Sequence, residues 1–242
     1  MSDEKNRPGY SSPPCYAHEF ELGEHGYAEI DPETARDVAR WRKSERERLI
    51  AMRLQVPIEE RKQVGDEIAA ELDRLIDMRE GLIVSTYWPF RGELDLRDWM
   101  ISAVERGVRI GLPVVVAKGQ PLTFREWHPR CRMERGVWNI PIPADGEQVV
   151  PDVTIAPPIG FDPECYRLGY GGGFYDRTLA SISPRPTAIG IAHPVAAIKT
   201  IFPQPYDIPM DVIVTGKDQV QINPNASDQA LARLAPETRR PA

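Results

Sequence analysis

Short apolar runs that alternate with amphipathic segments restrict the fold of this chain more strongly than any other feature. Six runs, at 82–87, 108–116, 122–128, 153–156, 187–192 and 212–215, are predicted strands, and the segments at 96–106 and 174–182 are predicted helices. Strands that alternate with helices favour a mainly parallel sheet covered by helices on both faces. We therefore expect an α/β domain.

The chain before these strands divides into an arm and two helices. Prolines and glycines interrupt any period in residues 1–30, which predicts an irregular arm. A helix is expected over 31–52, where Asp31 can cap the start and Pro32 suits the first helical position, and a second helix over 58–78. The polar, Pro- and Ala-rich residues from 223 onward predict a tail. The expected domain spans 31–222, between an arm at 1–30 and a C-terminal tail at 223–242.

Charge and composition argue against several classes of function. The 242 residues carry 30 Lys and Arg against 36 Asp and Glu, a formal net charge of −6, which disfavours nucleic acid or an anionic membrane as the main partner. No run approaches the roughly 20 apolar residues that cross a bilayer. Three widely spaced cysteines indicate no disulfide framework and fit a reducing compartment. We expect a cytoplasmic protein, whose acidic mixed surface is compatible with a monomer.

The strongest candidate site is a glycine-rich segment at 161–177. Glycine occupies 169, 171, 172 and 173, after a predicted strand and before a predicted helix, so backbone N–H groups can converge there on an anion. The spacing matches neither a P-loop nor a dinucleotide-binding turn, and a tight turn explains the glycines about as well. Arg167 can neutralise phosphate and Asp176 can hold Mg²⁺. The rings of Tyr170, Phe174 and Tyr175 suit either a flat ligand or core packing.

Three other segments carry charged side chains that suit a ligand site. Residues 88–95 follow the first predicted strand, at the end where open α/β sheets bind ligands. Glu93 or Asp95 can accept hydrogen bonds from a polar heterocycle there, and Asp95 also suits a helix cap. Basic residues cluster at 42, 43, 46, 48 and 53, which is otherwise the pattern of a solvated helix face. Asp207 and Asp211 are candidate metal or nucleotide ligands, or turn residues.

Together these segments resemble the 5-formyltetrahydrofolate cyclo-ligase family, also called the methenyltetrahydrofolate synthetases. The resemblance runs from about residue 42 to 215 and rests on ordered stretches that include TYWPFRGELD, FDPECYRLGYGGGFYDRTLA and PYDIPMDVIVT. It implies a three-layer α/β/α sandwich with a mainly parallel sheet, similar to ribose-phosphate isomerases and CoA transferases. It also implies ATP and Mg²⁺ as cofactors and a reduced folate as substrate.

The resemblance implies an ATP-dependent ring closure that converts 5-formyltetrahydrofolate to 5,10-methenyltetrahydrofolate. An N-formyl amide is a poor electrophile, so phosphorylation of the formyl oxygen activates its carbon for attack by the second folate nitrogen, and phosphate leaves. The residues implied at the nucleotide are Arg42, Lys43, Arg46, Arg167, Gly169, Gly171, Gly172, Gly173 and Tyr175. Those implied at the folate are Phe90, Glu93, Asp95, Tyr170 and Phe174. Asp176 and Asp207 match the metal positions. The catalytic candidates are Arg46, Arg167 and Tyr175.

The chain departs from the family pattern at several charged or polar positions. Arg42 and Gly172 stand where lysine is common, Leu96 where threonine is common, and Tyr206 where histidine is common. A lysine lost to Gly172 leaves phosphate charge less neutralised. Two alternatives therefore stay open beside the folate ligase: a non-catalytic relative that binds a nucleotide or phosphorylated ligand for regulation, and an ATP-dependent ligase that acts on another cyclic amide.

Overall fold

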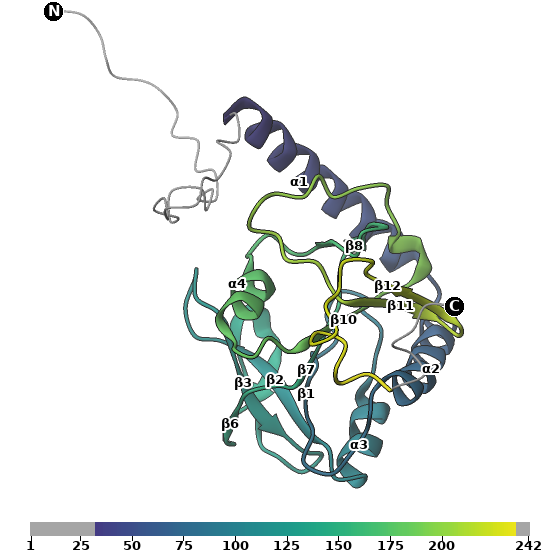
Figure 1. Ribbon diagram of the computed structural model, residues 1–242, viewed down its shortest axis with the longest axis vertical. Coiled ribbons are helices and arrows are strands. Elements are labelled where there is room, and N and C mark those ends of the chain that lie inside the picture. Colours follow the sequence, from purple (N-terminus) through teal and green to yellow (C-terminus); the bar gives the residue numbers. More distant parts are fainter. Residues whose placement is uncertain (1–31, 236–242) are drawn as a thin grey trace, which may run out of the picture.

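The structure is a computed structural model that describes residues 32–235 (Figure 1). The predicted arm at 1–30 lies outside these residues. Among the described helices, none is long and apolar enough to cross a membrane.

An eight-stranded sheet forms the centre of the molecule, in the order β12-β11-β10-β7-β1-β2-β3-β6. Its parallel strands are β11 (Val212–Gly216), β10 (Thr187–Ile191), β7 (Val153–Ala156), β1 (Ile83–Ser85) and β2 (Arg109–Val115). Its antiparallel strands are β12 (Gln219–Ile222), β3 (Leu122–Trp127) and β6 (Gln148–Val149). The expected mainly parallel sheet is confirmed, and all six predicted strands belong to it. The short strands β6 and β12 were not predicted.

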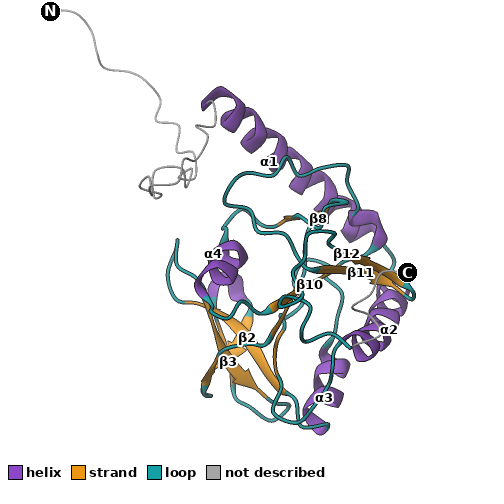
Figure 2. Cartoon of the chain, in the orientation of Figure 1, coloured by secondary structure: helices purple, strands orange, loops and turns teal. Residues whose placement is uncertain are grey.

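Helices cover both faces of the sheet, as Figures 1 and 2 show. The helices are α1 (Pro32–Gln55), α2 (Ile58–Leu75), α3 (Arg97–Glu105) and α4 (Phe174–Ser181). Alternate residues of β11 show the two faces: Val212 and Val214 pack in one apolar core with α2 and α3, and Ile213 packs in another with Leu179 of α4. Side chains of successive strand residues point to opposite faces, which explains this division. The α/β/α layering is therefore confirmed.

Two hairpins stand outside the sheet. One pairs β4 (Met133–Arg135) with β5 (Pro141–Pro143), and its tip is the 3-10 turn η2 (Val137–Asn139). The other pairs β8 (Gly160–Phe161) with β9 (Arg167–Leu168) and leads directly into the glycine-rich loop. A second 3-10 turn, η3 (Pro194–Ala196), follows β10. Strands of two or three residues are too short to show a period in the sequence, so neither hairpin was predicted.

The segment after residue 222 differs from the predicted tail. Leu231 and Leu234 are buried in the same core as α2 and α3. Leu234 forms a β-bridge with Ile76, and the backbone N–H of Ala235 donates to the carbonyl of Leu75 at 2.7 Å. The domain therefore continues through residue 235, beyond the expected boundary at 222, because a few spaced apolar side chains anchor an otherwise polar segment.

Candidate functional site

The glycine-rich loop joins the β8–β9 hairpin to α4. Gly171 and Gly173 have φ angles of 88° and 60°, in the left-handed region that glycine adopts without strain. The backbone N–H groups of Gly169, Tyr170 and Gly171 donate no hydrogen bond to another described residue. A Cβ atom at position 169 would meet nothing within 4 Å. These three successive N–H groups lie beside open space and are available to bind an anion, and we call them the anion cradle.

Two guanidinium groups border the anion cradle. Nε of Arg46, on α1, donates to the Gly169 carbonyl at 2.7 Å, and the Arg46 Cζ would lie 3.4 Å from a Cβ at Gly171. Arg177, in α4, donates to the carbonyl of Gly172, and its Cζ lies 5.5 Å from the centroid of the Phe174 ring. Arg177 thus brings a positive charge to Gly172, one of the positions at which the sequence departs from the family pattern described above.

A hydrogen-bonded cluster joins the loop after β1 to the glycine-rich loop. The Tyr170 hydroxyl donates to Glu93 Oε1 at 2.9 Å and accepts from Nη2 of Arg53 at 2.8 Å. The backbone N–H of Phe90 donates to Glu93 Oε2 at 2.9 Å. The two predicted ligand segments therefore meet through Tyr170 and Glu93, although the glycine-rich loop follows the β8–β9 hairpin and not a strand of the central sheet. Arg53 belongs to the basic cluster noted in the sequence, but its partnership with Tyr170 was not predicted.

Burial controls the ionisation of this cluster. It raises the pKa of Glu93 to about 7, against the opposing effects of Arg53, the Tyr170 hydroxyl and the Phe90 N–H. It also raises the pKa of Tyr170, with a further contribution from Glu93. Tyr170 therefore stays a neutral donor near neutral pH, while Glu93 is divided between its two forms.

Aromatic rings surround the cluster and include one that the sequence analysis missed. The Tyr170 ring centroid lies 6.1 Å from that of Phe90 and 6.0 Å from that of Trp138, and Trp138 lies 6.4 Å from Phe174. Trp138 sits at the tip of the β4–β5 hairpin with a φ of 56° and is 52% exposed. A tryptophan in a short polar segment between predicted strands was the available signal. These rings form a surface that suits a flat heterocycle.

Arg42 and Asp207 are paired with each other. Nη2 of Arg42 lies 2.5 Å from Asp207 Oδ2, and both side chains are about nine-tenths buried. Arg42 also donates to the carbonyls of Ile201 and Phe202, and Asp207 accepts from the Gln204 N–H. This pair anchors α1 to the 201–207 loop, and the phosphate contact expected of Arg42 and the metal contact expected of Asp207 stay predictions. Lys43, the next residue, is exposed.

Arg167 lies beneath the loop and holds Asp176. Its Nη2 donates to Asp176 Oδ1 at 2.7 Å, its Nη1 donates to the Ile208 carbonyl, and its side chain is 4% exposed. Oδ1 of Asp176 also accepts from the Ile208 N–H, whereas Oδ2 has no hydrogen-bond partner in residues 32–235. The Tyr175 ring lies 5.7 Å from the Arg167 Cζ, and burial raises the pKa of Tyr175. Arg167 is therefore placed to orient Asp176.

Asp176 fits a Mg²⁺ ion that carries phosphates. Mg²⁺ binds proteins through one or two carboxylates and completes its shell with phosphate oxygens and water. Asp176 offers one unused carboxylate oxygen in the first turn of α4, directly after the loop. No group of three or more His, Cys, Asp or Glu side chains in the described chain is arranged to hold a metal without such a ligand.

Asp95 does not join the cluster. Its carboxylate accepts from the Arg97 backbone N–H at 3.0 Å and forms an ion pair with the Arg97 guanidinium at 2.5 Å. Both side chains are nearly half exposed. The N-cap position of α3 is Leu96, so Asp95 is not the capping residue that the sequence offered as its alternative role; it lies one residue earlier and accepts from the N–H of the first helical residue.

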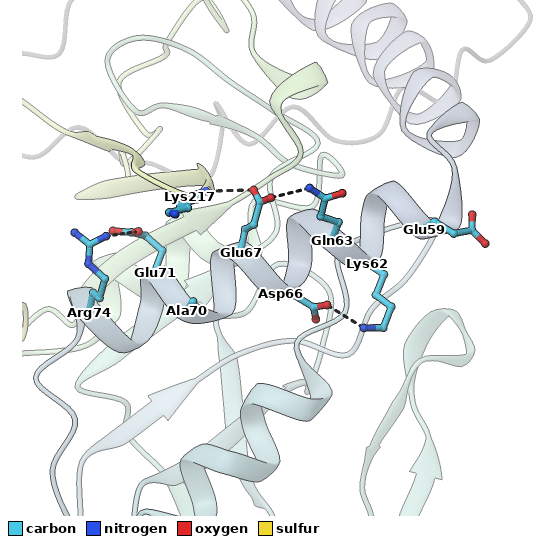
Figure 3. Close-up of a pocket in the computed structure, with 9 residues that line it drawn as sticks. All are labelled: Glu59, Lys62, Gln63, Asp66, Glu67, Ala70, Glu71, Arg74 and Lys217. Carbon is cyan, nitrogen blue, oxygen red and sulfur yellow. Dashed lines mark hydrogen bonds and ion pairs between the residues drawn. The ribbon is translucent and has the colours of Figure 1, made fainter.

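A surface groove lies along α2 and is lined by none of the predicted site residues (Figure 3). Its charged side chains largely pair with one another: Lys62 with Asp66 at 2.9 Å and Arg74 with Glu71 at 3.2 Å. Across the groove, the Lys217 backbone N–H faces Glu67. The groove therefore presents self-paired charges and does not extend the candidate site.

The fold and the side chains gathered beside the glycine-rich loop are those of an α/β enzyme. Residues 38–216 match the 5-formyltetrahydrofolate cyclo-ligase family, so the chain belongs to this family of carbon–nitrogen ligases of folate metabolism. The 5-formyltetrahydrofolate cyclo-ligase of Escherichia coli K12 is 31% identical over 65% of this chain and 90% of its own length. That of Haemophilus influenzae is 26% identical over 64% of this chain and 86% of its own.

Solved structures agree with this assignment. The 5,10-methenyltetrahydrofolate synthetase of Aquifex aeolicus superposes with a TM-score of 0.65 and 26% identity, over 77% of this chain and 94% of that one. The synthetase of Mycoplasma pneumoniae superposes with a TM-score of 0.57 at 20% identity, over 72% of this chain and 97% of that one, and shares the fold.

Proposed function

We propose that this chain converts 5-formyltetrahydrofolate to 5,10-methenyltetrahydrofolate with ATP and Mg²⁺. The names of its relatives support the substrate and product. One observation carries the proposal: Tyr170 belongs to both halves of the site. Its backbone N–H lies in the anion cradle, and its hydroxyl donates to Glu93 in the aromatic cluster at 2.9 Å. A phosphate and a flat ring can therefore bind on either side of one residue, as phosphoryl transfer to the ring substituent requires.

The residues of the anion cradle fit the phosphates of ATP. Backbone N–H groups 169–171, with Arg46 and Arg177 beside them, would neutralise phosphate charge, and Oδ2 of Asp176 would face Mg²⁺. Bound ATP supplies the phosphoryl group that turns the formyl oxygen into a leaving group. Arg167 orients Asp176, and the Arg42–Asp207 pair supports α1 from behind.

The aromatic cluster fits the ring of a reduced folate. Phe90, Tyr170, Trp138 and Phe174 supply flat faces, and Glu93 can accept hydrogen bonds from ring N–H groups. A folate ring bound against these side chains would be partly shielded from water, which would favour attack by the folate nitrogen over hydrolysis. Burial raises the pKa of Tyr175, so its phenol stays protonated and can donate a hydrogen bond at this boundary.

The test is formation of methenyltetrahydrofolate, followed by its absorbance, from purified protein, ATP, Mg²⁺ and 5-formyltetrahydrofolate. We expect product only when all three ligands are present. Binding of ATP and folate without product would overturn the proposal in favour of the non-catalytic, regulatory relative. Turnover of another cyclic N-acyl compound in place of the folate would favour a different substrate. The cytoplasmic location and monomeric state expected from the sequence stay predictions.

A further inference from the structure

We infer that Arg53 is a positioning residue that holds Glu93 and Tyr170 in the arrangement that recognises the folate ring, and that it makes this recognition depend on pH. The inference rests on the proposed function, because it takes the ring bound beside Glu93 to be the folate. The sequence analysis placed Arg53 in a basic cluster but assigned it no individual role.

Arg53 connects three segments that are distant in sequence. It lies near the end of α1 and is 6% exposed. Its Nε donates to the carbonyl of Arg91, in the loop after β1, at 3.0 Å. Its Nη2 donates to the Tyr170 hydroxyl, in the glycine-rich loop, at 2.8 Å. One guanidinium therefore sets the distance between the loop that carries Glu93 and the loop that carries the anion cradle.

The direction of the hydrogen bonds around Glu93 suits its ionised form. A guanidinium only donates, so the Tyr170 oxygen accepts from Arg53 and its single proton points to Glu93 Oε1. Glu93 Oε2 accepts from the Phe90 N–H. Both oxygens of Glu93 thus act as acceptors, as a carboxylate requires, and their remaining lone pairs can accept from ring N–H groups. A protonated Glu93 would present a donor at one oxygen and leave fewer lone pairs for ring N–H groups.

The charges around Glu93 single out Arg53 as its cationic partner. Burial raises the pKa of Glu93 to about 7, and Arg53 opposes that rise. The other titratable groups near Glu93 come from the end of β1, α4 and the segment after β10: Tyr87, Tyr175 and His193. Burial raises the pKa of both phenols, so they stay neutral. The His193 Nε2 lies 3.2 Å from Glu60, and the Arg91 guanidinium lies over the Phe90 ring at 5.0 Å.

Removal of the Arg53 charge should shift the titration of Glu93. An opposite charge within a few ångströms typically moves a carboxyl pKa by about one unit or more, so Arg53→Met should raise the pKa of Glu93 by roughly one unit. At neutral pH most Glu93 would then carry a proton. We expect the Kd for 5-formyltetrahydrofolate at pH 7 to rise about fivefold, and the loss of affinity on acidification to begin about one pH unit higher.

Two measurements on the full chain test the inference. Carbon-13 NMR of the ligand-free protein follows the Glu93 carboxyl through its titration, and tryptophan fluorescence gives the Kd for 5-formyltetrahydrofolate from pH 5.5 to 9. Three variants are compared. Arg53→Met removes the charge and Arg53→Lys restores it. Tyr170→Phe removes the hydroxyl that connects Arg53 with Glu93 and leaves Arg53 in place. Arg48→Met, an exposed arginine on the same helix, is the matched control.

The expected pattern is a raised Glu93 pKa in Arg53→Met and Tyr170→Phe, near-normal behaviour in Arg53→Lys, and no change in Arg48→Met. In a Glu93→Gln background, Arg53→Met should produce no further pH shift. An affinity loss equal at every pH, with an unmoved Glu93 titration, would show that Arg53 only supports the fold. Folate binding without turnover would contradict the proposed activity alone. Absence of folate binding at every pH would contradict both the proposed activity and the inference about Arg53.

Discussion

Three arginines that the sequence analysis placed at the nucleotide, Arg42, Arg46 and Arg167, have different partners in the structure. Arg42 and Arg167 form buried ion pairs with Asp207 and Asp176. Arg46 instead donates to the Gly169 carbonyl, and no ion pair joins it to a carboxylate in residues 32–235. A guanidinium already paired with a carboxylate brings little net charge to a ligand, so Arg46 is the better candidate to neutralise phosphate.

Replacement of Arg46 by alanine should weaken ATP use selectively. Loss of a hydrogen bond to a charged group costs about 1.5–3 kcal/mol, so we expect the KM for ATP to rise roughly 10- to 100-fold while the KM for folate changes little. Steady-state kinetics with each substrate varied in turn measures both constants. Arg48→Ala, an exposed position on α1 paired with Glu45, is the control and should behave like wild type. Equal increases in both KM values would contradict a specific role at the phosphates.

The segment after β12 closes the core that α2 and α3 form on the sheet. Beyond the bridge from Leu234 to Ile76, the Thr187 hydroxyl donates to the Ala230 carbonyl, and the Asn223 side-chain amide donates to the Met210 carbonyl at 3.0 Å. These contacts join it to β10 and to the loop before β11. A chain that reads as polar is therefore a structural element of the domain.

Leu234→Ala should destabilise the protein. Leu234 is fully buried, and removal of a buried leucine side chain typically lowers the free energy of unfolding by about 2–5 kcal/mol. Urea denaturation followed by circular dichroism measures the change. Leu54→Ala, at a position 54% exposed on α1, should alter stability by less than about 0.5 kcal/mol. Similar stability of Leu234→Ala and wild type would show that the segment is dispensable for the fold.

The folded protein buries the carboxyl group of Glu93, whose ionised form is more stable in water. Glu93 lies where the carboxyl end of β1 meets segments after β7 and β10: Pro157, Pro158 and His193 line the same small cavity as Glu93 and Arg53. Because burial raises the pKa of Glu93 from 4.5 to about 7, the folded state keeps a proton that the unfolded chain releases between these pH values. Glu93 therefore lowers stability as the pH rises through this range, most fully above pH 7.

Glu93→Gln should stabilise the protein in a pH-dependent way. From the shift of the Glu93 pKa, we expect the variant to gain about 3 kcal/mol in the free energy of unfolding above pH 8, where the wild-type side chain is ionised in both the folded and the unfolded protein. Below pH 4.5 the expected gain is almost zero. Urea denaturation of both proteins from pH 4 to 9 gives the difference. Glu47→Gln, at an exposed position on α1, should show no such trend. A stability difference independent of pH would contradict the burial of an ionisable Glu93. We expect the same variant to lose folate affinity, since stability and function oppose each other at this position.

Local sequence patterns were sufficient for six strands of the central sheet, for the four helices and for the position of the two candidate ligand segments along the chain. Apolar runs reveal strands because a buried sheet needs continuous apolar side chains, and the glycines at 169–173 mark a loop because few other residues adopt its backbone. The position of residues 88–95 at the carboxyl edge of the sheet also followed, because they come directly after β1. Each of these inferences depends on neighbours in sequence or on a general rule of sheets.

The partners of the long charged side chains could not be obtained in this way. Arg42 meets Asp207 across 165 positions, and Arg53 meets Tyr170 across 117. No periodicity specifies which of several basic residues on one helix reaches which distant acceptor, because that depends on how the helix packs against loops. The same holds for Trp138, which approaches Tyr170 only through the fold of a short hairpin. Packing therefore settled which arginines support the fold and which face the site, since burial and distance set the strength of each charge interaction.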